Sequence, residues 1–279
     1  GVPPFDAILS DHFMPAFDKA IASKTREVEA ITATEAAPTF DNTVLALEHS
    51  GDLLRRVQGV FFNLMSAETD DALQEIATEV TPKLAALNDD IMLDEALFAR
   101  VHAVWAQRDE LDLDPEQLKL VEEMHTDFER AGAALDDEAK TRLRQINQRM
   151  SMLGLEFREN LRRATNDYQL VITDEARLAG LSEGVVAGAR EAAEAAGLDE
   201  GWVFTLQAPS IWPFLSAAED RELRRRILTA YTGRCAEGTE YDNTDILTEM
   251  AELRLEKAQL LGYDSWAHFV LAERMAGTP

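Results

Sequence analysis

Residues 252–279 read ELRLEKAQLLGYDSWAHFVLAERMAGTP. The leucines of the first half recur at helical spacing, and Gly262 suits the position just after a helix, where the backbone turns left-handed. A second amphipathic segment follows over 264–275. Thr278 and Pro279 then stand in the order of a helix cap and a first helical residue. The stretch predicts two helices and the start of another, so we expect the chain to be part of a longer polypeptide.

The rest of the chain is dominated by the same pattern of helices joined by loops of a few residues. Apolar residues recur every three or four positions, and Asp, Asn or Ser stands where a helix begins. The clearest helix is 136–163, whose apolar seam is about 40 Å long at 1.5 Å per residue. Further helices are predicted over 15–32, 41–64 with a bend at Ser50-Gly51, 70–87 with an irregularity at Pro82, 94–105, 114–128, 182–196, 219–231 and 243–261.

Two short runs rich in β-branched and aromatic residues, 168–172 and 203–206, interrupt the helices. They predict strands that pair as a small two-stranded sheet. The segment 209–215 predicts an ordered turn, because its two prolines restrict the backbone. We therefore predict a mainly α fold, with a helical bundle over 1–165 and a strand pair followed by helices over 166–279.

The composition limits the possible function classes. Lys plus Arg is 27 and Asp plus Glu is 52, which gives a formal net charge of −25. So acidic a surface repels phosphate backbones and anionic lipid, which argues against nucleic acid and membrane partners. Cys235 is the only cysteine, consistent with a reducing cytoplasm. No apolar run approaches the roughly 20 residues that span a bilayer, and the N-terminus lacks the order of a signal peptide, so we expect a cytoplasmic chain.

Residues Gly180 to Gly184 match the pattern G-x-S-x-G, which in esterases contains a serine nucleophile. In those enzymes the serine directly follows a strand, whereas here about ten residues separate Ser182 from the predicted strand. Ser182 stands instead at the start of an amphipathic segment, which is typical of an N-cap. We interpret Ser182 as a helix cap, and a serine hydrolase is the weaker alternative.

The histidines do not form the common zinc motif. None of the five is followed by another histidine four residues later, as a H-E-x-x-H helix requires. His125 could present three ligands from one helical face together with Glu122 and Glu129. However, Val121 and Phe128 share the face of His125, so a buried or boundary histidine beside solvated acids is the favoured interpretation. No metal ligand is assigned.

The remaining charged residues identify no catalytic set. Paired acids such as Asp89-Asp90 and Asp136-Asp137 are too common in so acidic a chain to nominate a general acid and base. Basic residues cluster on two predicted helices, where they are interpreted as salt-bridged faces, the alternative being capture of a carboxylate on a substrate or a docking domain. The clusters are Arg158, Arg162 and Arg163, and Arg224, Arg225 and Arg226. No catalytic residue is assigned, and the substrate-binding residues remain unknown.

Several short stretches with a more specific character are spread along the whole chain. They are Ser10–Phe17, Pro38–Thr43, Val60–Leu64, Pro82–Ala85, His125–Phe128, Arg130–Ala133, Pro209-Ser210, Pro213–Leu215, Arg254–Ala258, Leu260–Tyr263, Met275-Ala276 and Thr278-Pro279. In this order they resemble the zinc oligopeptidases of the thimet oligopeptidase and oligopeptidase A family, and most closely its peptidyl-dipeptidases.

The resemblance implies a two-lobed helical fold whose deep channel admits short peptides and which releases C-terminal dipeptides. In that family the zinc ligands come from a H-E-x-x-H helix and a later glutamate, positions that would lie after Pro279. This chain would then be an inactive N-terminal part without a cofactor of its own, forming one channel wall. Its partners would be the zinc-bearing C-terminal catalytic domain and oligopeptide substrates. The alternative is a stand-alone helical binding or scaffold protein.

Overall fold

The computed structural model describes residues 2–236 and 238–279. Its fold is mainly α with one two-stranded antiparallel sheet, which confirms the fold class predicted from the sequence. The chain divides into two compact units, the first comprising 1–152 and 252–279 and the second comprising 153–251. Among the described residues, no helix combines the length and the apolar character needed to cross a membrane.

The boundaries of these units fall inside helices. Helix α7 (Asp137–Asp167) contains the first boundary and helix α11 (Thr244–Leu260) contains the second. The backbone stays helical across both boundaries. Gly154 lies beside the first one without interrupting α7, so no loop in the sequence marks either boundary. The predicted division at 165/166 differs from these boundaries and, as a statement about domains, stays a prediction.

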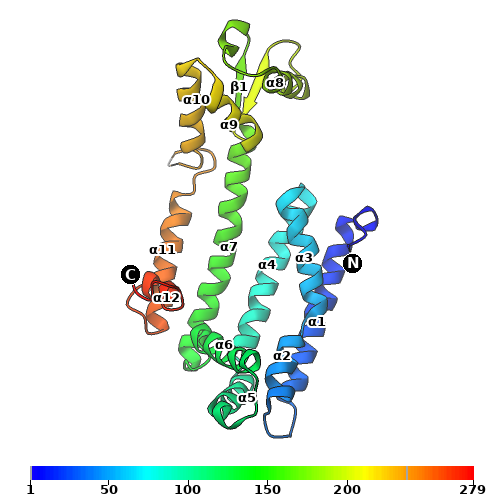
Figure 1. Ribbon diagram of the computed structural model, residues 1–279, viewed down its shortest axis with the longest axis vertical. Helices are drawn as coiled ribbons and strands as arrows, with labels where there is room; N and C mark the ends of the chain where they lie inside the picture. Colours follow the sequence, from blue (N-terminus) through cyan, green and yellow to red (C-terminus); the bar gives the residue numbers. More distant parts are fainter. Residues whose placement is uncertain (1, 237) are drawn as a thin grey trace. The chain divides into compact units, whose positions relative to one another are not determined.

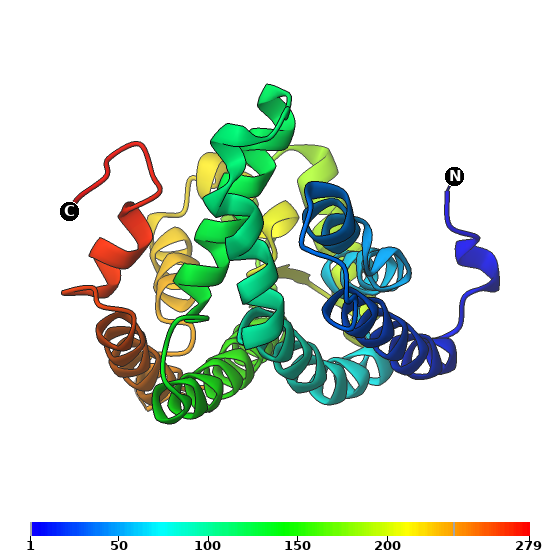
Figure 2. The same ribbon diagram turned by 90° about the horizontal axis from the view of Figure 1, so that it is seen from below.

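In the first unit, α1 (Phe13–Thr32) lies beside α3 (Asp52–Ala67) and α4 (Asp71–Met92) (Figure 1, Figure 2). Phe17 of α1 and Phe61 of α3 are fully buried, with ring centroids 5.2 Å apart. Phe13 meets Phe61 edge-on at 5.1 Å. The elements of this unit are η1 (Phe5–Ala7), η2 (Ser10–His12), α1 (Phe13–Thr32), η3 (Phe40–Leu45), α2 (Ala46–His49), α3 (Asp52–Ala67), α4 (Asp71–Met92, not ended by Pro82), α5 (Glu95–Ala106), η4 (Arg108–Glu110), α6 (Pro115–Ala131) and α12 (Trp266–Leu271), with parts of α7 and α11.

The bend predicted at Ser50-Gly51 is a complete break between α2 and α3. Gly51 has a left-handed backbone, with φ 81°, which glycine adopts without a steric penalty. Its N–H donates to Glu27 Oε2 at 2.6 Å, and Lys24 Nζ donates to Ser50 O at 3.3 Å. Two side chains of α1 therefore fix the place where α3 begins.

The second unit contains the predicted strand pair, β1 (Gln169–Ile172) and β2 (Trp202–Thr205), which run antiparallel (Figure 1). Leu170 lies opposite Phe204, and both are buried in a core to which three helices contribute. The other elements of this unit are η5 (Glu175–Leu178), α8 (Glu183–Ala195), α9 (Ala208–Ala217) and α10 (Arg221–Thr232), with parts of α7 and α11.

The segment 209–215 lies in α9, so the prediction of a turn there is wrong. Pro209 occupies the first turn of the helix, where the missing N–H costs no hydrogen bond. Ile211 and Phe214 stand three positions apart on one helical face, and both are fully buried. The apolar surface that these two side chains bury as a helix offsets the hydrogen bond lost at the second proline.

Candidate functional site

Helices α5 and α6 bring two histidines and a tryptophan together in the first unit. His125 is 2% exposed, and its Nε2 lies 2.9 Å from His102 Nδ1. The Trp105 ring stacks on His125 with ring centroids 4.1 Å apart. On the other side, Glu129 Oε2 lies 3.5 Å from His125 Nδ1, and the Glu129 side chain is 56% exposed. These contacts confirm the prediction of a buried histidine beside a solvated acid.

The surroundings of His125 favour its neutral form. Burial lowers the pKa of the imidazole, the Glu129 carboxylate opposes this, and His102 and Arg108 lower the pKa further. A neutral imidazole has one N–H and one lone pair, so one histidine of the pair donates their hydrogen bond and the other accepts it. The pair is therefore a satisfied polar contact in an apolar setting.

This geometry does not fit zinc. A zinc site needs three or four protein ligands around one ion, and here only His102 Nδ1 and His125 Nε2 face a common position. Glu129 approaches the opposite nitrogen of His125, and Glu122 lines a cavity of about 680 Å³ beside Trp105. Within the described ranges, no group of three His, Cys, Asp or Glu side chains is placed to hold a metal ion.

Ser182 lies at the start of α8, and its hydroxyl accepts the N–H of Val185 at 3.5 Å. The short helix η5 separates it from β1, so the chain does not pass directly from a strand into the serine turn. Gly180 has φ 88°, and its backbone lies close to the carbonyl oxygen of Ala217. The geometry supports the interpretation of Ser182 as a helix cap.

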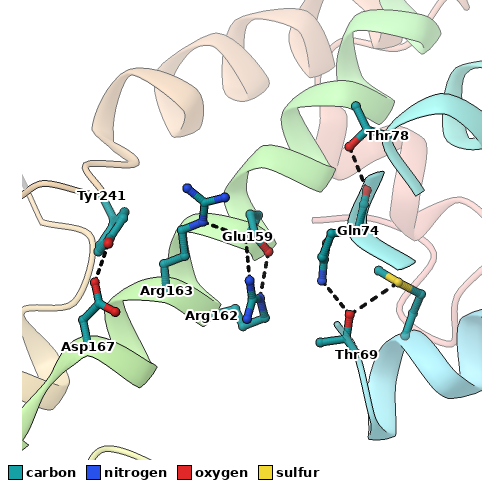
Figure 3. A network of polar contacts seen from close by, with 9 residues as sticks. Thr69, Gln74, Thr78, Glu159, Arg162, Arg163, Asp167 and Tyr241 are labelled. Atoms are coloured by element: carbon teal, nitrogen blue, oxygen red, sulfur yellow. Dashed lines mark hydrogen bonds and ion pairs between the residues drawn. The ribbon is translucent and has the colours of Figure 1, made fainter. Parts of the chain in front are cut away.

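The first arginine cluster is an ion-pair group near the end of α7 (Figure 3). Glu159 accepts two hydrogen bonds from Arg162, both at 2.8 Å, and one from Arg163 at 2.7 Å. These bonds hold the pKa of the Glu159 carboxyl at about 2, with partial burial opposing them. Arg158 is exposed one turn earlier. The interpretation of Arg162 and Arg163 as a salt-bridged face is confirmed.

We expect Glu159→Gln to lower the free energy of unfolding by about 2 kcal/mol at pH 7. The folded pKa, about 2, lies below the ordinary value of 4.5, so the carboxylate stabilises the fold above pH 4.5. That contribution is lost as the pH falls from 4.5 toward 2. Urea unfolding at several pH values checks this. A variant with the same acid dependence as the parent between pH 4.5 and 2 would contradict the assignment.

Two residues of the second arginine cluster, on α10, are also engaged within the protein. Arg225 pairs with Glu222, with an N–O distance of 2.5 Å, and Arg224 donates to the carbonyl oxygen of Ala218. One of these arginines thus belongs to a salt-bridged face, as predicted, whereas the other reaches the backbone at the end of α9. Carboxylate capture by this cluster remains an untested alternative.

Sequence reasoning missed a polar network that connects three helices of the first unit. Asn147 of α7 donates to Asp89 Oδ1 at 2.7 Å and accepts from Lys257 Nζ of α11 at 2.7 Å. Burial raises the pKa of Asp89 and lowers that of Lys257, each partly offset by its charged neighbours. The adjacent Asp90 instead pairs with Arg144 at 2.6 Å. The two acids of this pair therefore have different structural roles, which their adjacency in sequence did not indicate.

The chain is similar in sequence to known peptidases over nearly its whole length. The chain is 42% identical to the dipeptidyl carboxypeptidase of Salmonella typhimurium over 277 residues, which are 99% of this chain and 41% of that relative. It is 40% identical to the dipeptidyl carboxypeptidase of Escherichia coli, with the same coverage. It is 32% identical to oligopeptidase A of Salmonella typhimurium over 282 residues, 100% of this chain and 41% of that relative.

The chain therefore spans about two fifths of the length of these relatives, 41% in each case. The family model of peptidase family M3 matches residues 214–279, which include α10, α11 and α12. The similarity to the relatives extends over nearly all remaining residues, so it covers both compact units. The family match over 214–279 and these relatives together show that the chain is similar to members of peptidase family M3.

Proposed function

We propose that this chain is the N-terminal, non-catalytic portion of a zinc peptidyl-dipeptidase that releases C-terminal dipeptides from short oligopeptides. The observation that carries the proposal is the 42% identity to a dipeptidyl carboxypeptidase over 99% of this chain, of which the chain spans only 41%. The rest of such a polypeptide would be the catalytic domain and the chain's main partner. Cytoplasmic location, with neither nucleic acid nor membrane as a partner, is part of the proposal.

The role proposed for these residues is to form one wall of a substrate channel. Helices of 16, 22 and 31 residues, α3, α4 and α7, supply long surfaces of the kind that a wall requires. The zinc of the whole enzyme would supply Lewis-acid chemistry and an activated water. The described residues do not fit that metal, because His102 and His125 lack a third ligand beside them. The wall would limit by size which peptides enter the channel. Cleavage of the peptide bond would take place in the remaining part of the polypeptide.

The proposal is tested by comparing the 279-residue chain with the full polypeptide encoded by its gene. Zinc content and release of dipeptides from an N-blocked tetrapeptide are measured for both. We expect the full polypeptide to bind one zinc and cleave, and the 279-residue chain to do neither. Tight one-to-one zinc in the 279-residue chain that disappears in His125→Ala would overturn the proposal. A stop codon after Pro279 would instead favour the helical binding or scaffold protein.

A further inference from the structure

We propose that the contact between His102 and His125 is a pH-sensitive switch, which is closed while one hydrogen lies between the two imidazoles and opens when acid protonates both rings. His102 Nδ1 and His125 Nε2 lie 2.9 Å apart, so a single hydrogen occupies the space between them. When both rings are protonated, each of the two facing nitrogens carries a hydrogen and both rings are positively charged. The rings then repel each other and cannot keep this distance.

The two rings differ in their freedom to move. His125 is 2% exposed, and the Trp105 ring stacks on it with centroids 4.1 Å apart. Val121 and Phe128, which lie on the same face of α6 as His125, are fully buried, so this helix holds the His125 ring in the core. His102 is exposed, and its side chain can rotate about χ1 and χ2 toward water. We therefore assign the movement to His102.

The groups around His125 disfavour a positive charge on its ring. Burial is the largest cause that lowers the pKa of His125 from its ordinary value of 6.5. Glu129 of α6 lies 3.5 Å from Nδ1 and opposes this, but its side chain is 56% exposed, and water weakens its attraction. His102 of α5 and Arg108 of η4 lower the pKa of His125 further. The Arg108 guanidinium lies over the Trp105 ring, with its central carbon 4.5 Å from the ring centroid.

The contact survives one extra proton but not two. The first can be held by the outer nitrogen of His102, Nε2, because the Nδ1–H of His102 still donates to His125 Nε2. Glu129 favours this arrangement, since a hydrogen on His125 Nδ1 leaves Nε2 as the acceptor. A second proton, on His125 Nε2, removes that acceptor. Because the folded pKa of His125 lies below 6.5, the contact is stable above pH 6.5 and is lost as the pH falls from 6.5 through the folded value.

Opening of the switch changes the surface where α5 meets α6. The His102 ring lies against Trp105, with centroids 5.5 Å apart, and Trp105 also lines a cavity of about 680 Å³ whose other lining residues are mostly charged. When His102 turns away, the stacked rings of Trp105 and His125 are exposed to water beside this cavity. Val101 and Val104 of α5 are buried on either side of His102, so the two helices stay packed and the change is confined to the rings.

The test uses the 279-residue chain labelled with 5-fluorotryptophan, and the Trp105 resonance is identified by its loss in Trp105→Phe. The difference in the fluorine chemical shift of this resonance between H₂O and D₂O measures how far the ring contacts water. We expect this difference to increase about twofold as the pH is lowered from about 7.5 to about 5, while far-UV circular dichroism shows unchanged helix content. No increase, or a loss of helix over the same range, would overturn the proposal.

Substitutions then locate the switch in the histidine pair. His102→Gln is expected to abolish the increase, because an uncharged amide can still accept the Nε2–H of a protonated His125. His125→Gln is expected to abolish it as well, because the pair can no longer carry two charges. His49→Gln is the matched control and should keep the increase, since His49 is an exposed histidine at the end of α2. An increase of the parent's size in His102→Gln, an exposed position whose replacement leaves the core intact, would overturn the assignment. The test does not depend on cleavage, so it can fail while the proposed function holds.

Discussion

Replacing Gly180 with alanine is expected to lower the free energy of unfolding of the second unit by about 4 kcal/mol. Gly180 has φ 88°, a left-handed backbone that a side chain disfavours. A Cβ at this position would lie 2.2 Å from the carbonyl oxygen of Ala217, which is far inside van der Waals contact. The contact is with backbone, so no flexible side chain can move away. The adjacent Ala179 carbonyl accepts the Glu219 N–H at 2.9 Å, and this bond would be displaced as well.

The matched control is Gly184→Ala in the same G-x-S-x-G pattern. Gly184 lies in α8, and a Cβ there would meet nothing within 4 Å. Alanine should therefore stabilise the helix by roughly 0.5–1 kcal/mol. Urea unfolding gives both energies, and hydrogen exchange read by mass spectrometry locates the loss in residues 169–205. If the Gly180→Ala chain has the same free energy of unfolding as the parent chain, the backbone of Gly180 does not lie as close to the carbonyl oxygen of Ala217 as described.

Truncation of Phe61 to alanine is expected to destabilise the first unit by about 4 kcal/mol. Phe61 is fully buried and meets Phe13 and Phe17 edge-on at 5.1 and 5.2 Å. Its removal loses the transfer free energy of the ring and leaves a void between α1 and α3, which the neighbouring helices can fill only in part. Urea unfolding followed by circular dichroism measures the effect.

Phe62 provides the internal comparison, because it is the next residue and 41% exposed. Phe62→Ala should cost less than about 1 kcal/mol, since the ring is partly in water before the change. The difference between the two losses in free energy of unfolding separates the effect of burial from the effect of removing a phenylalanine ring. Similar losses for Phe61→Ala and Phe62→Ala would contradict the packing of α3 on α1 described above.

Helix starts were the feature that the sequence predicted best. Three of the predicted caps, Asp70, Asp94 and Asp114, each accept a backbone N–H three residues later at 2.6–2.9 Å. A cap is local chemistry, so the residue type and its position before an apolar pattern are sufficient to identify it. The α9 helix was missed for the opposite reason. Its two prolines gave a strong local signal for a turn, and burial of Ile211 and Phe214 prevailed only in the folded unit.

The polar sites were harder to predict because their partners are distant in sequence. The contact between His102 and His125 depends on the relative rotation of α5 and α6. Helical periodicity indicates which face of each helix is apolar, but not which two residues meet across the contact. Asn147 likewise joins Asp89 and Lys257, residues 58 and 110 positions away. In both cases the residue types were visible in the sequence and the pairing was not.

The break between α2 and α3 constrains the order in which the chain assembles. The N–H of Gly51 is satisfied by Glu27, a residue 24 positions earlier on another helix, and not by a side chain of its own segment. A helix start that depends on a distant carboxylate gains nothing until loop closure has brought the two segments together. We therefore expect the start of α3 to gain this stabilisation only after α1 has docked, whereas the caps of α4, α5 and α6 are local and stabilise their helices without such docking.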